Sequence, residues 1–233
     1  MKILIQSLLI MHVVAGAISL VVAPIAMAVR KGGKQHRIWG KVFFWGMTVV
    51  AFTAIILSIY RFIPFLLMIA IFSYYAVFSG YRSLYHKQLH LGKGVKKLDW
   101  IALIIAFLFN VAFITWGAFQ AFNGLYGFFA YLAIGFGIGG LLSVRGNYSA
   151  FTKPPEDKRR WLYEHIGGML GGYIAATTAF SSQVMTFMPG VWAWIWPSLV
   201  GVPMLNLFIR YYRKRLEGGA KLSDVVIVSN LEK

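Results

Sequence analysis

Residues 3–29, ILIQSLLIMHVVAGAISLVVAPIAMAV, are followed at once by the basic stretch RKGGKQHRIWGK, residues 30–41. A hydrocarbon core about 30 Å thick is crossed by about 20 apolar residues in a helix, so the first stretch is long enough to span a bilayer. It is also longer than the core of a secretory signal peptide, although Ala15-Gly16-Ala17 is similar to a cleavage site. We therefore predict a first membrane-spanning helix that is retained in the protein.

The composition of the whole chain leads to the same class of protein. Of the 233 residues, 59% are hydrophobic and only 13% are charged, whereas a soluble domain carries about 25% charged residues. This predicts an all-α integral membrane protein with a seven-helix transmembrane bundle in residues 1–210 and a short basic cytoplasmic tail in 211–233. The predicted spans are 3–29, 41–60, 64–82, 100–121, 125–144, 162–186 and 190–210.

The Lys and Arg residues predict the orientation of this bundle. Cytoplasmic loops carry the excess of these residues, so we expect the N-terminus outside and the C-terminus in the cytoplasm. All of the 23 Lys and Arg residues but Lys2 and Arg61 lie in four segments that this topology places on one side: 30–41, 82–97, 145–160 and 210–233.

The net charge of +16 is thereby explained by topology. We expect contacts with the lipid bilayer and its anionic head groups and no binding of nucleic acid, in a multi-pass protein of the bacterial inner membrane. All acidic residues lie outside the predicted span cores, which argues against a pump driven by buried carboxylates. The chain has no cysteine, so thiolate metal sites are excluded.

The histidines suggest a metal site at the cytoplasmic face. If the third helix continues past Tyr85, His86 and His90 lie one turn apart on one helix face, a spacing that lets two imidazoles reach one metal. His165, with Glu164 beside it, would complete the ligand set of a divalent metal such as zinc. Solvated interface residues are the alternative. The predicted metal ligands are His36, His86, His90, Glu164 and His165.

Two imidazoles from different helices could instead hold a haem b, whose propionates an arginine would pair in bidentate fashion. His12, inside the first span, is either such a ligand or a structural histidine bonded to a neighbouring backbone. The predicted cofactor-binding residues are His12, His36, Arg37, Arg145 and His165. Separately, the spacings Gly135-xxx-Gly139 and Gly168-xxx-Gly172 predict tight packing of the fifth and sixth helices. The alternative is that the space left by the missing side chains admits a flat cofactor or a lipid chain.

Several short motifs resemble an uncharacterised bacterial family of predicted multi-span membrane proteins. The motifs are HRIWG at 36–40, similar to a His-Arg-Xaa-Xaa-Gly signature after the first helix, EHIGGM at 164–169 and YIAATTAF at 173–180. The resemblance implies a multi-span inner-membrane protein and no established activity, and it favours His12, His36, Arg37, Gly40 and His165 as site residues. The likeness to small b-type membrane cytochromes and to seven-span zinc hydrolases is looser.

Three functions remain open from the sequence. The first is a haem- or quinone-linked redox protein with a histidine-centred site at the cytoplasmic face. The second is a metal-dependent membrane hydrolase in which Glu164 acts as general base and a metal-bound water is the nucleophile. The third is a transporter, or a membrane-embedded partner subunit of a redox or other membrane protein, without a catalytic site.

Overall fold

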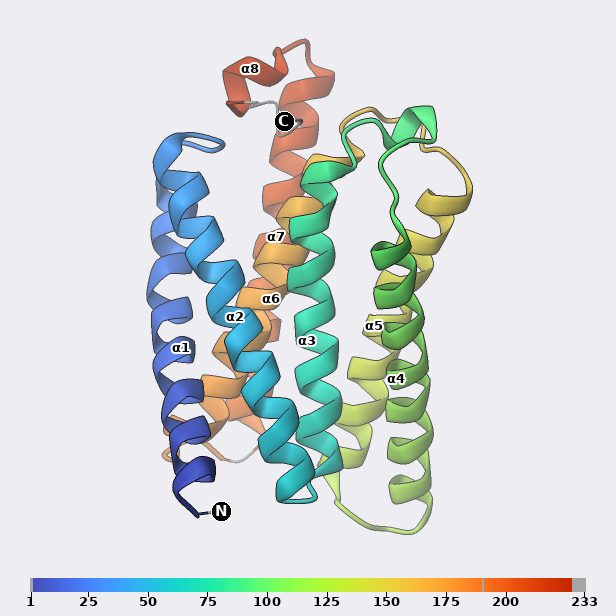
Figure 1. The fold of residues 1–233 in the computed structure, drawn as a ribbon. Helices are drawn as coiled ribbons and strands as arrows, with labels where there is room; N and C mark the ends of the chain where they lie inside the picture. The colour runs from blue at the N-terminus through green and yellow to red at the C-terminus, as the bar shows by residue number, and fades with distance from the viewer. Residues whose placement is uncertain (1, 190, 228–233) are drawn as a thin grey trace. The chain divides into compact units, whose positions relative to one another are not determined.

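The computed structural model describes residues 2–189 and 191–227, and all regular structure in these ranges is helical (Figure 1). This confirms the predicted all-α class. The short elements are two 3-10 turns, η1 (Ser83–Tyr85) and η2 (Leu89–Leu91), and the helix α8 (Leu222–Val225). The long helices are α1 (Lys2–Ala28), α2 (Lys34–Tyr60), α3 (Pro64–Arg82), α4 (Lys97–Phe122), α5 (Phe128–Thr152), α6 (Arg160–Val184) and α7 (Trp192–Glu217).

Six helices within the described residues are long and apolar enough to cross a membrane, namely α1 to α5 and α7. The prediction of a multi-pass membrane protein is therefore confirmed in this coarser form. Helix α6 is long enough but less apolar, because its sequence RWLYEHIGGMLGGYIAATTAFSSQV contains glycines, hydroxyl side chains and charges.

Several helices extend beyond their predicted apolar spans, and α2 and α7 do so into strongly basic sequence. Helix α2 begins at Lys34, so the stretch KQHRIWGK forms its first turns instead of a loop. Helix α7 continues to Glu217, past the expected end of the last span at residue 210. Lys and Arg are good helix formers, and no proline interrupts either extension, so the helices continue where the apolar sequence stops.

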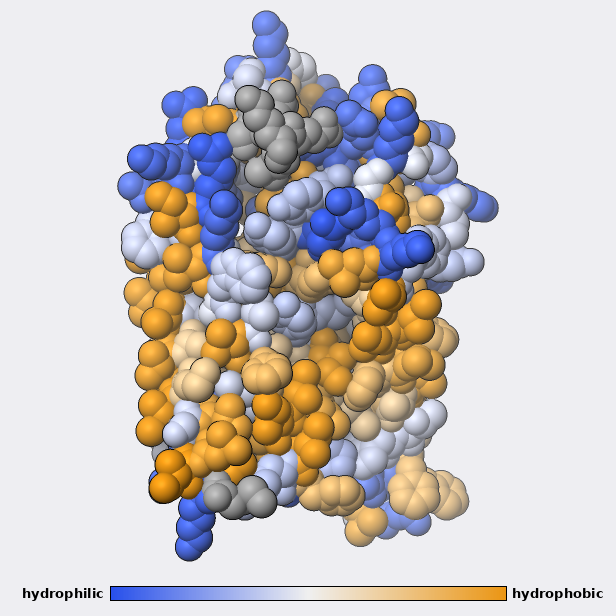
Figure 2. All heavy atoms as spheres, in the orientation of Figure 1, coloured by the Kyte–Doolittle hydropathy of each residue, from blue (hydrophilic) through white to orange (hydrophobic). Residues whose placement is uncertain are grey.

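The chain divides into two compact units, which we describe separately: unit 1 is Met1–Thr53 with Ile166–Lys233, and unit 2 is Ala54–His165. In unit 2, α3, α4 and α5 pack together. Hydrophobic side chains cover the midsection of α4 and α5 on the face at the right of Figure 2. Hydrophilic side chains gather at the upper end of these helices. Such an apolar band is what lipid-exposed helices require.

Small residues make the contact between α4 and α5. A side chain at Gly137 would meet the carbonyl oxygen of Asn110 at 3.0 Å, and one at Gly140 would overlap the Asn110 amide. At Gly135 and Gly139 an added Cβ would meet no described atom within 4 Å, so the predicted tight packing at these two glycines is wrong. The alternative, a flat cofactor or a lipid chain in this space, stays a prediction. The helix period instead buries a different face of α5: Ala130, Ala133, Gly137, Gly140, Val144, Asn147 and Ala150.

In unit 1, the C-terminal segment returns to the turn between α1 and α2. The Ile227 amide donates a hydrogen bond of 3.0 Å to the Lys31 carbonyl oxygen. Gly32 has a φ of 72°, and a side chain there would overlap the Ile227 carbonyl, so glycine is required. The Lys31 ammonium donates to carbonyl groups at the end of α1, and burial lowers its pKa. We call this contact of Ile227 with residues 31–33 the C-terminal clasp.

Candidate functional site

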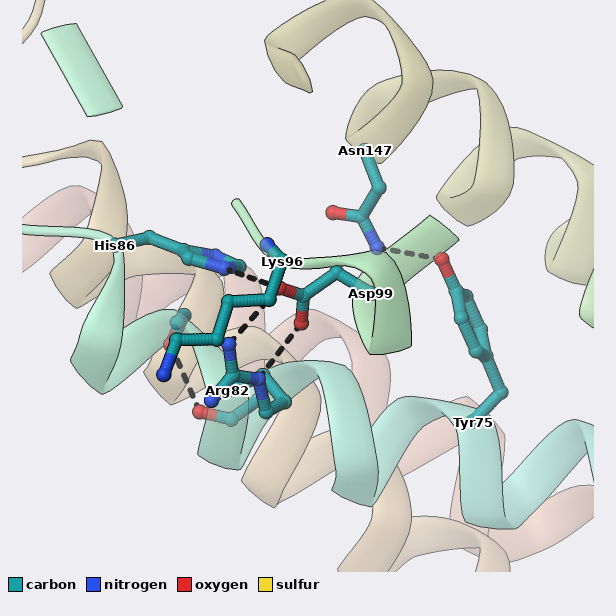
Figure 3. A network of polar contacts seen from close by, with 8 residues as sticks. Tyr75, Arg82, His86, Lys96, Asp99 and Asn147 are labelled. Atoms are coloured by element: carbon teal, nitrogen blue, oxygen red, sulfur yellow. Dashed lines mark hydrogen bonds and ion pairs between the residues drawn. The ribbon is translucent and has the colours of Figure 1, made fainter. Parts of the chain in front are cut away.

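Asp99 is the centre of a polar network at one end of unit 2 (Figure 3). Arg82 binds it in bidentate fashion, with Nε donating to Oδ1 at 2.7 Å and Nη2 to Oδ2 at 2.9 Å. The Lys96 amide donates to Oδ2 at 2.8 Å, and His86 Nε2 lies 3.3 Å from the same oxygen. The Asp99 side chain is only 2% exposed. We call these four residues the Asp99 network.

Local sequence explains how these residues meet. Arg82 ends α3, two 3-10 turns reverse the chain, and Asp99 lies in the first turn of α4, where a carboxylate caps amide groups and faces the positive end of the helix dipole. Gly94 closes the connection with a φ of 106°, and a Cβ there would lie 2.8 Å from the Tyr85 carbonyl oxygen. The turn therefore depends on glycine, and the network depends on the turn.

The hydrogen bonds around Asp99 decide whether a buried carboxylate is tolerated. Removing an ion from water costs several kcal/mol, and only good geometry with additional donors offsets that cost. Asp99 has both, because the guanidinium of Arg82 supplies two parallel hydrogen bonds and the backbone supplies a third. The arrangement is a satisfied network and not a vacant carboxylate awaiting a cation.

A pocket that is partly open to solvent lies against this network. Its apolar wall is largely aromatic and comprises Phe78, Leu89, Ala150, Phe151 and Trp161. Its polar wall comprises Tyr75, Ser79, Arg82, Ser83, His86, Asp99, Asn147, Arg160 and Glu164.

Formal charges cancel across the pocket, histidine aside. Arg82 pairs with Asp99, and Arg160 lies 3.2 Å from Glu164, one turn along α6. Arg160 also donates to the Gly146 carbonyl oxygen at 2.8 Å. An inorganic anion or a bare metal cation gains nothing from two cations that already face two carboxylates. The pocket is therefore better suited to a neutral ligand with an apolar body.

A second polar pair lies deeper along α3. The Asn147 side-chain amide donates to the Tyr75 hydroxyl oxygen at 2.8 Å, and both residues are buried. Figure 3 shows this pair on one side of Asp99, with Arg82 and His86 on the other. The pocket thus carries hydrogen-bonding groups at two places.

The predicted pairing of His86 and His90 on one helix is wrong. Helix α3 ends at Arg82, and the two histidines fall in separate turns around η1 and η2. His86 is buried against Asp99, whereas His90 Nδ1 is buried with no hydrogen-bond partner in the described part of the chain. Glycines at 92 and 94 make the connection turn instead of continuing the helix.

The predicted metal ligands do not form a metal centre in the described part of the chain. Residues 2–189 and 191–227 contain no group of three or more His, Cys, Asp or Glu side chains placed to hold a metal ion. In unit 2, His86 faces Asp99, Glu164 faces Arg160, and His165 Nδ1 lies 2.9 Å from the Gly80 carbonyl oxygen. Each of these predicted ligands has a protein partner in place of a shared ion.

The two histidines of unit 1 are far apart along α1, because His12 lies within this helix and His36 contacts its C-terminal end. His12 Nδ1 lies 3.0 Å from the Thr53 hydroxyl, which itself donates to a backbone carbonyl, so the imidazole is the donor. His36 Nδ1 lies 2.9 Å from the Ala26 carbonyl oxygen. At about 1.5 Å per residue, the levels of residues 12 and 26 are roughly 20 Å apart along the helix. His12 and His36 therefore do not ligate one haem together.

Arg37 and Arg145, the predicted propionate partners, have exposed side chains.

Two of the residues that line the pocket, His86 and Glu164, are among the predicted site residues, whereas Tyr75, Asp99 and Asn147 are not. One signal in the sequence points to Asp99, since it is the only acid in 82–99, a segment with five cations, and it lies just before a long apolar run. Tyr75 and Asn147 carry no such signal, because a tyrosine and an asparagine in apolar helices are ordinary interhelical hydrogen-bonding groups.

No family model, no curated protein and no solved structure matches the chain. The resemblance to a His-Arg-Xaa-Xaa-Gly family therefore stays a prediction, and function must be argued from the geometry of the site.

Proposed function

We propose that this chain is a redox protein of the bacterial inner membrane that binds a quinone in the pocket beside Asp99. The observation that carries the proposal is a largely aromatic pocket whose charges cancel, with a histidine–aspartate pair on its wall. Quinones are flat, neutral and membrane-soluble, and their two carbonyl oxygens accept hydrogen bonds. These properties match both the apolar and the polar wall.

The histidine–aspartate pair gives the pocket a route for protons. Reducing a quinone to a quinol consumes two electrons and two protons, one proton for each carbonyl oxygen. Histidine is the side chain whose ordinary pKa lies nearest neutrality, and His86 lies 3.3 Å from the Asp99 carboxylate. In the proposal, His86 passes protons from the solvent to the ring, and a one-electron donor protein in the same membrane supplies the electrons.

The proposed topology has seven spans, with α6 as the sixth, the N-terminus outside and the C-terminus in the cytoplasm. The segments 82–97 and 145–160 border the pocket and carry ten of the Lys and Arg residues, so the positive-inside rule supports a pocket at the cytoplasmic face. The same cations would contact anionic lipid head groups.

A haem is the second candidate cofactor, supported by one specific observation. In unit 2, His165 directs Nδ1 at the Gly80 carbonyl oxygen at 2.9 Å. Metal-ligating histidines usually make such a hydrogen bond with the ring nitrogen that does not bind the metal. No comparable observation favours the hydrolase, which would need a group of three ligands.

Binding of a water-soluble, short-tailed benzoquinone to the purified protein tests the proposal. We compare the wild type with Ser79→Phe, which fills the pocket, and with Ser149→Phe, the same change at an exposed position of α5. We expect about one quinone per chain for the wild type and Ser149→Phe, and loss of binding in Ser79→Phe.

The absorption spectrum of the same samples, oxidised and reduced, separates the two cofactors. A Soret band would favour haem ligation by histidine. A colourless protein that binds no quinone, or equal binding by Ser79→Phe, would contradict the quinone proposal. Absence of both cofactors would favour a transporter or partner subunit.

A further inference from the structure

We infer that the Tyr75 hydroxyl, oriented by Asn147, is the hydrogen-bond donor that selects a carbonyl-bearing ring in this pocket. The inference rests on the proposed function, because it names the group that recognises the quinone. It assigns a specificity role to two residues that neither the histidine pattern nor the Asp99 network includes.

The direction of one hydrogen bond determines where the Tyr75 proton points. Asn147 Nδ2 donates to the tyrosine oxygen at 2.8 Å, so that oxygen acts as acceptor. A phenol has a single O–H donor, and an NH2 group cannot accept it. The hydroxyl hydrogen of Tyr75 is therefore left for an acceptor other than Asn147.

Burial makes an unused donor at this place costly. Tyr75 is 7% exposed and Asn147 is 8% exposed, and Tyr75 packs in a cluster with Leu103, Ala106 and Val144. A buried polar hydrogen without an acceptor is destabilising, and an incoming acceptor removes that cost. Both residues line the pocket, so a bound ring is the acceptor that they can reach.

Tyr75 and Asn147 lie at a different depth along α3 from the charged groups of the Asp99 network. Tyr75 lies seven residues before Arg82 on α3, which is about 10 Å along the helix axis. A carbonyl oxygen at Tyr75 is thus on the membrane-core side of the Asp99 network, where an unsolvated neutral acceptor is favoured over a charged one. The donor therefore selects the oxygen of a neutral ring and not a carboxylate or phosphate.

The test uses the ratio of two affinities in the full-length protein. The two probes are the short-tailed benzoquinone and its dimethylbenzene analogue, a six-membered ring of similar size with methyl groups in place of both carbonyl oxygens. One neutral hydrogen bond contributes about 0.5–1.5 kcal/mol, so the wild type should prefer the quinone by about 2- to 12-fold. Tyr75→Phe should lower this ratio to about 1 and leave the affinity for the analogue unchanged.

Asn147→Asp provides the second variant, because a carboxylate accepts but does not donate and would turn the Tyr75 hydroxyl away from the pocket. We expect it to lower the ratio as Tyr75→Phe does. The matched controls are Tyr148→Phe and Asn123→Asp, both at exposed positions, which should keep the wild-type ratio.

The outcomes separate this inference from the proposed function. No quinone binding by the wild type would overturn the proposed function itself. Quinone binding by the wild type with an unchanged ratio in both variants, or with equal weakening of both probes in both variants, would overturn only the role of Tyr75 and Asn147.

Discussion

Asp99 joins three parts of unit 2 through one carboxylate. Its partners come from the end of α3, from the turn that follows and from the start of its own helix. A residue that closes a loop and also lines a pocket contributes to both stability and ligand binding. Its substitution therefore tests the fold as well as the site.

We expect Asp99→Asn to lower the free energy of unfolding by about 3–5 kcal/mol, because it leaves the largely buried guanidinium of Arg82 without its counter-charge. Unfolding with a denaturing detergent, followed by circular dichroism, measures this difference.

Asp224→Asn is the matched control for that prediction. Asp224 has the same position in the first turn of α8 and also accepts a hydrogen bond from the backbone amide three residues before it, but it is exposed. Its loss should cost about 1 kcal/mol or less. Equal effects of the two substitutions would mean that Asp99 acts as a helix cap and not as an ion-pair partner.

At the scale of the elements, the α4–α5 contact depends on which glycines face the neighbouring helix. Gly140 lies directly against the Asn110 side chain, and Gly139, one residue before it, meets nothing. Adjacent residues on a helix differ by about 100° in direction, so two neighbouring glycines can have opposite effects when each is given a methyl group.

Gly140→Ala should destabilise the protein by about 1–3 kcal/mol, since the added Cβ forces the buried Asn110 amide to move. Gly139→Ala should be neutral or stabilising by about 1 kcal/mol, because alanine is the better helix former. Denaturing-detergent unfolding of the two variants side by side gives the difference. A loss of stability in Gly139→Ala alone would contradict the observed packing face.

The elements were more predictable from sequence than the site was. Hydropathy locates a long helix well, and the span predicted for 64–82 matches α3 residue for residue. Hydropathy does not determine which face of a helix packs. The Gly-xxx-Gly spacing therefore predicts a contact at Gly135 and Gly139, although Gly137 and Gly140 make the contact with α4.

The Asp99 network could not be predicted from the sequence for a related physical reason. Histidines in a sequence suggest a metal site because they can ligate metals. His86, however, contacts Asp99 only because the chain turns after Arg82. Contacts across such a turn depend on backbone geometry that composition and periodicity do not encode.

For the molecule as a whole, the side of the membrane that each connection faces is the next property to establish. The absence of cysteine makes this direct, since a single introduced cysteine is the only thiol in the chain. Labelling at three exposed positions distinguishes the proposed topology from its alternatives, namely Lys93, Asn123 and Ser223.

We expect a membrane-impermeant maleimide to label Asn123→Cys in intact cells and to label Lys93→Cys and Ser223→Cys only after the membrane is opened. External labelling of Ser223→Cys, with the other two as predicted, would mean that α6 does not cross the membrane. External labelling of Lys93→Cys would reverse the orientation and place the pocket on the other side.

The C-terminal clasp has a consequence for biosynthesis. Residue 31 leaves the ribosome almost 200 residues before residue 227, yet the Lys31 carbonyl oxygen and the Ile227 amide form a hydrogen bond with each other. Since chains fold progressively from the N-terminus as they are made, the turn between α1 and α2 is synthesised long before its partner. Unit 1 can therefore close only after residue 227 has emerged from the ribosome.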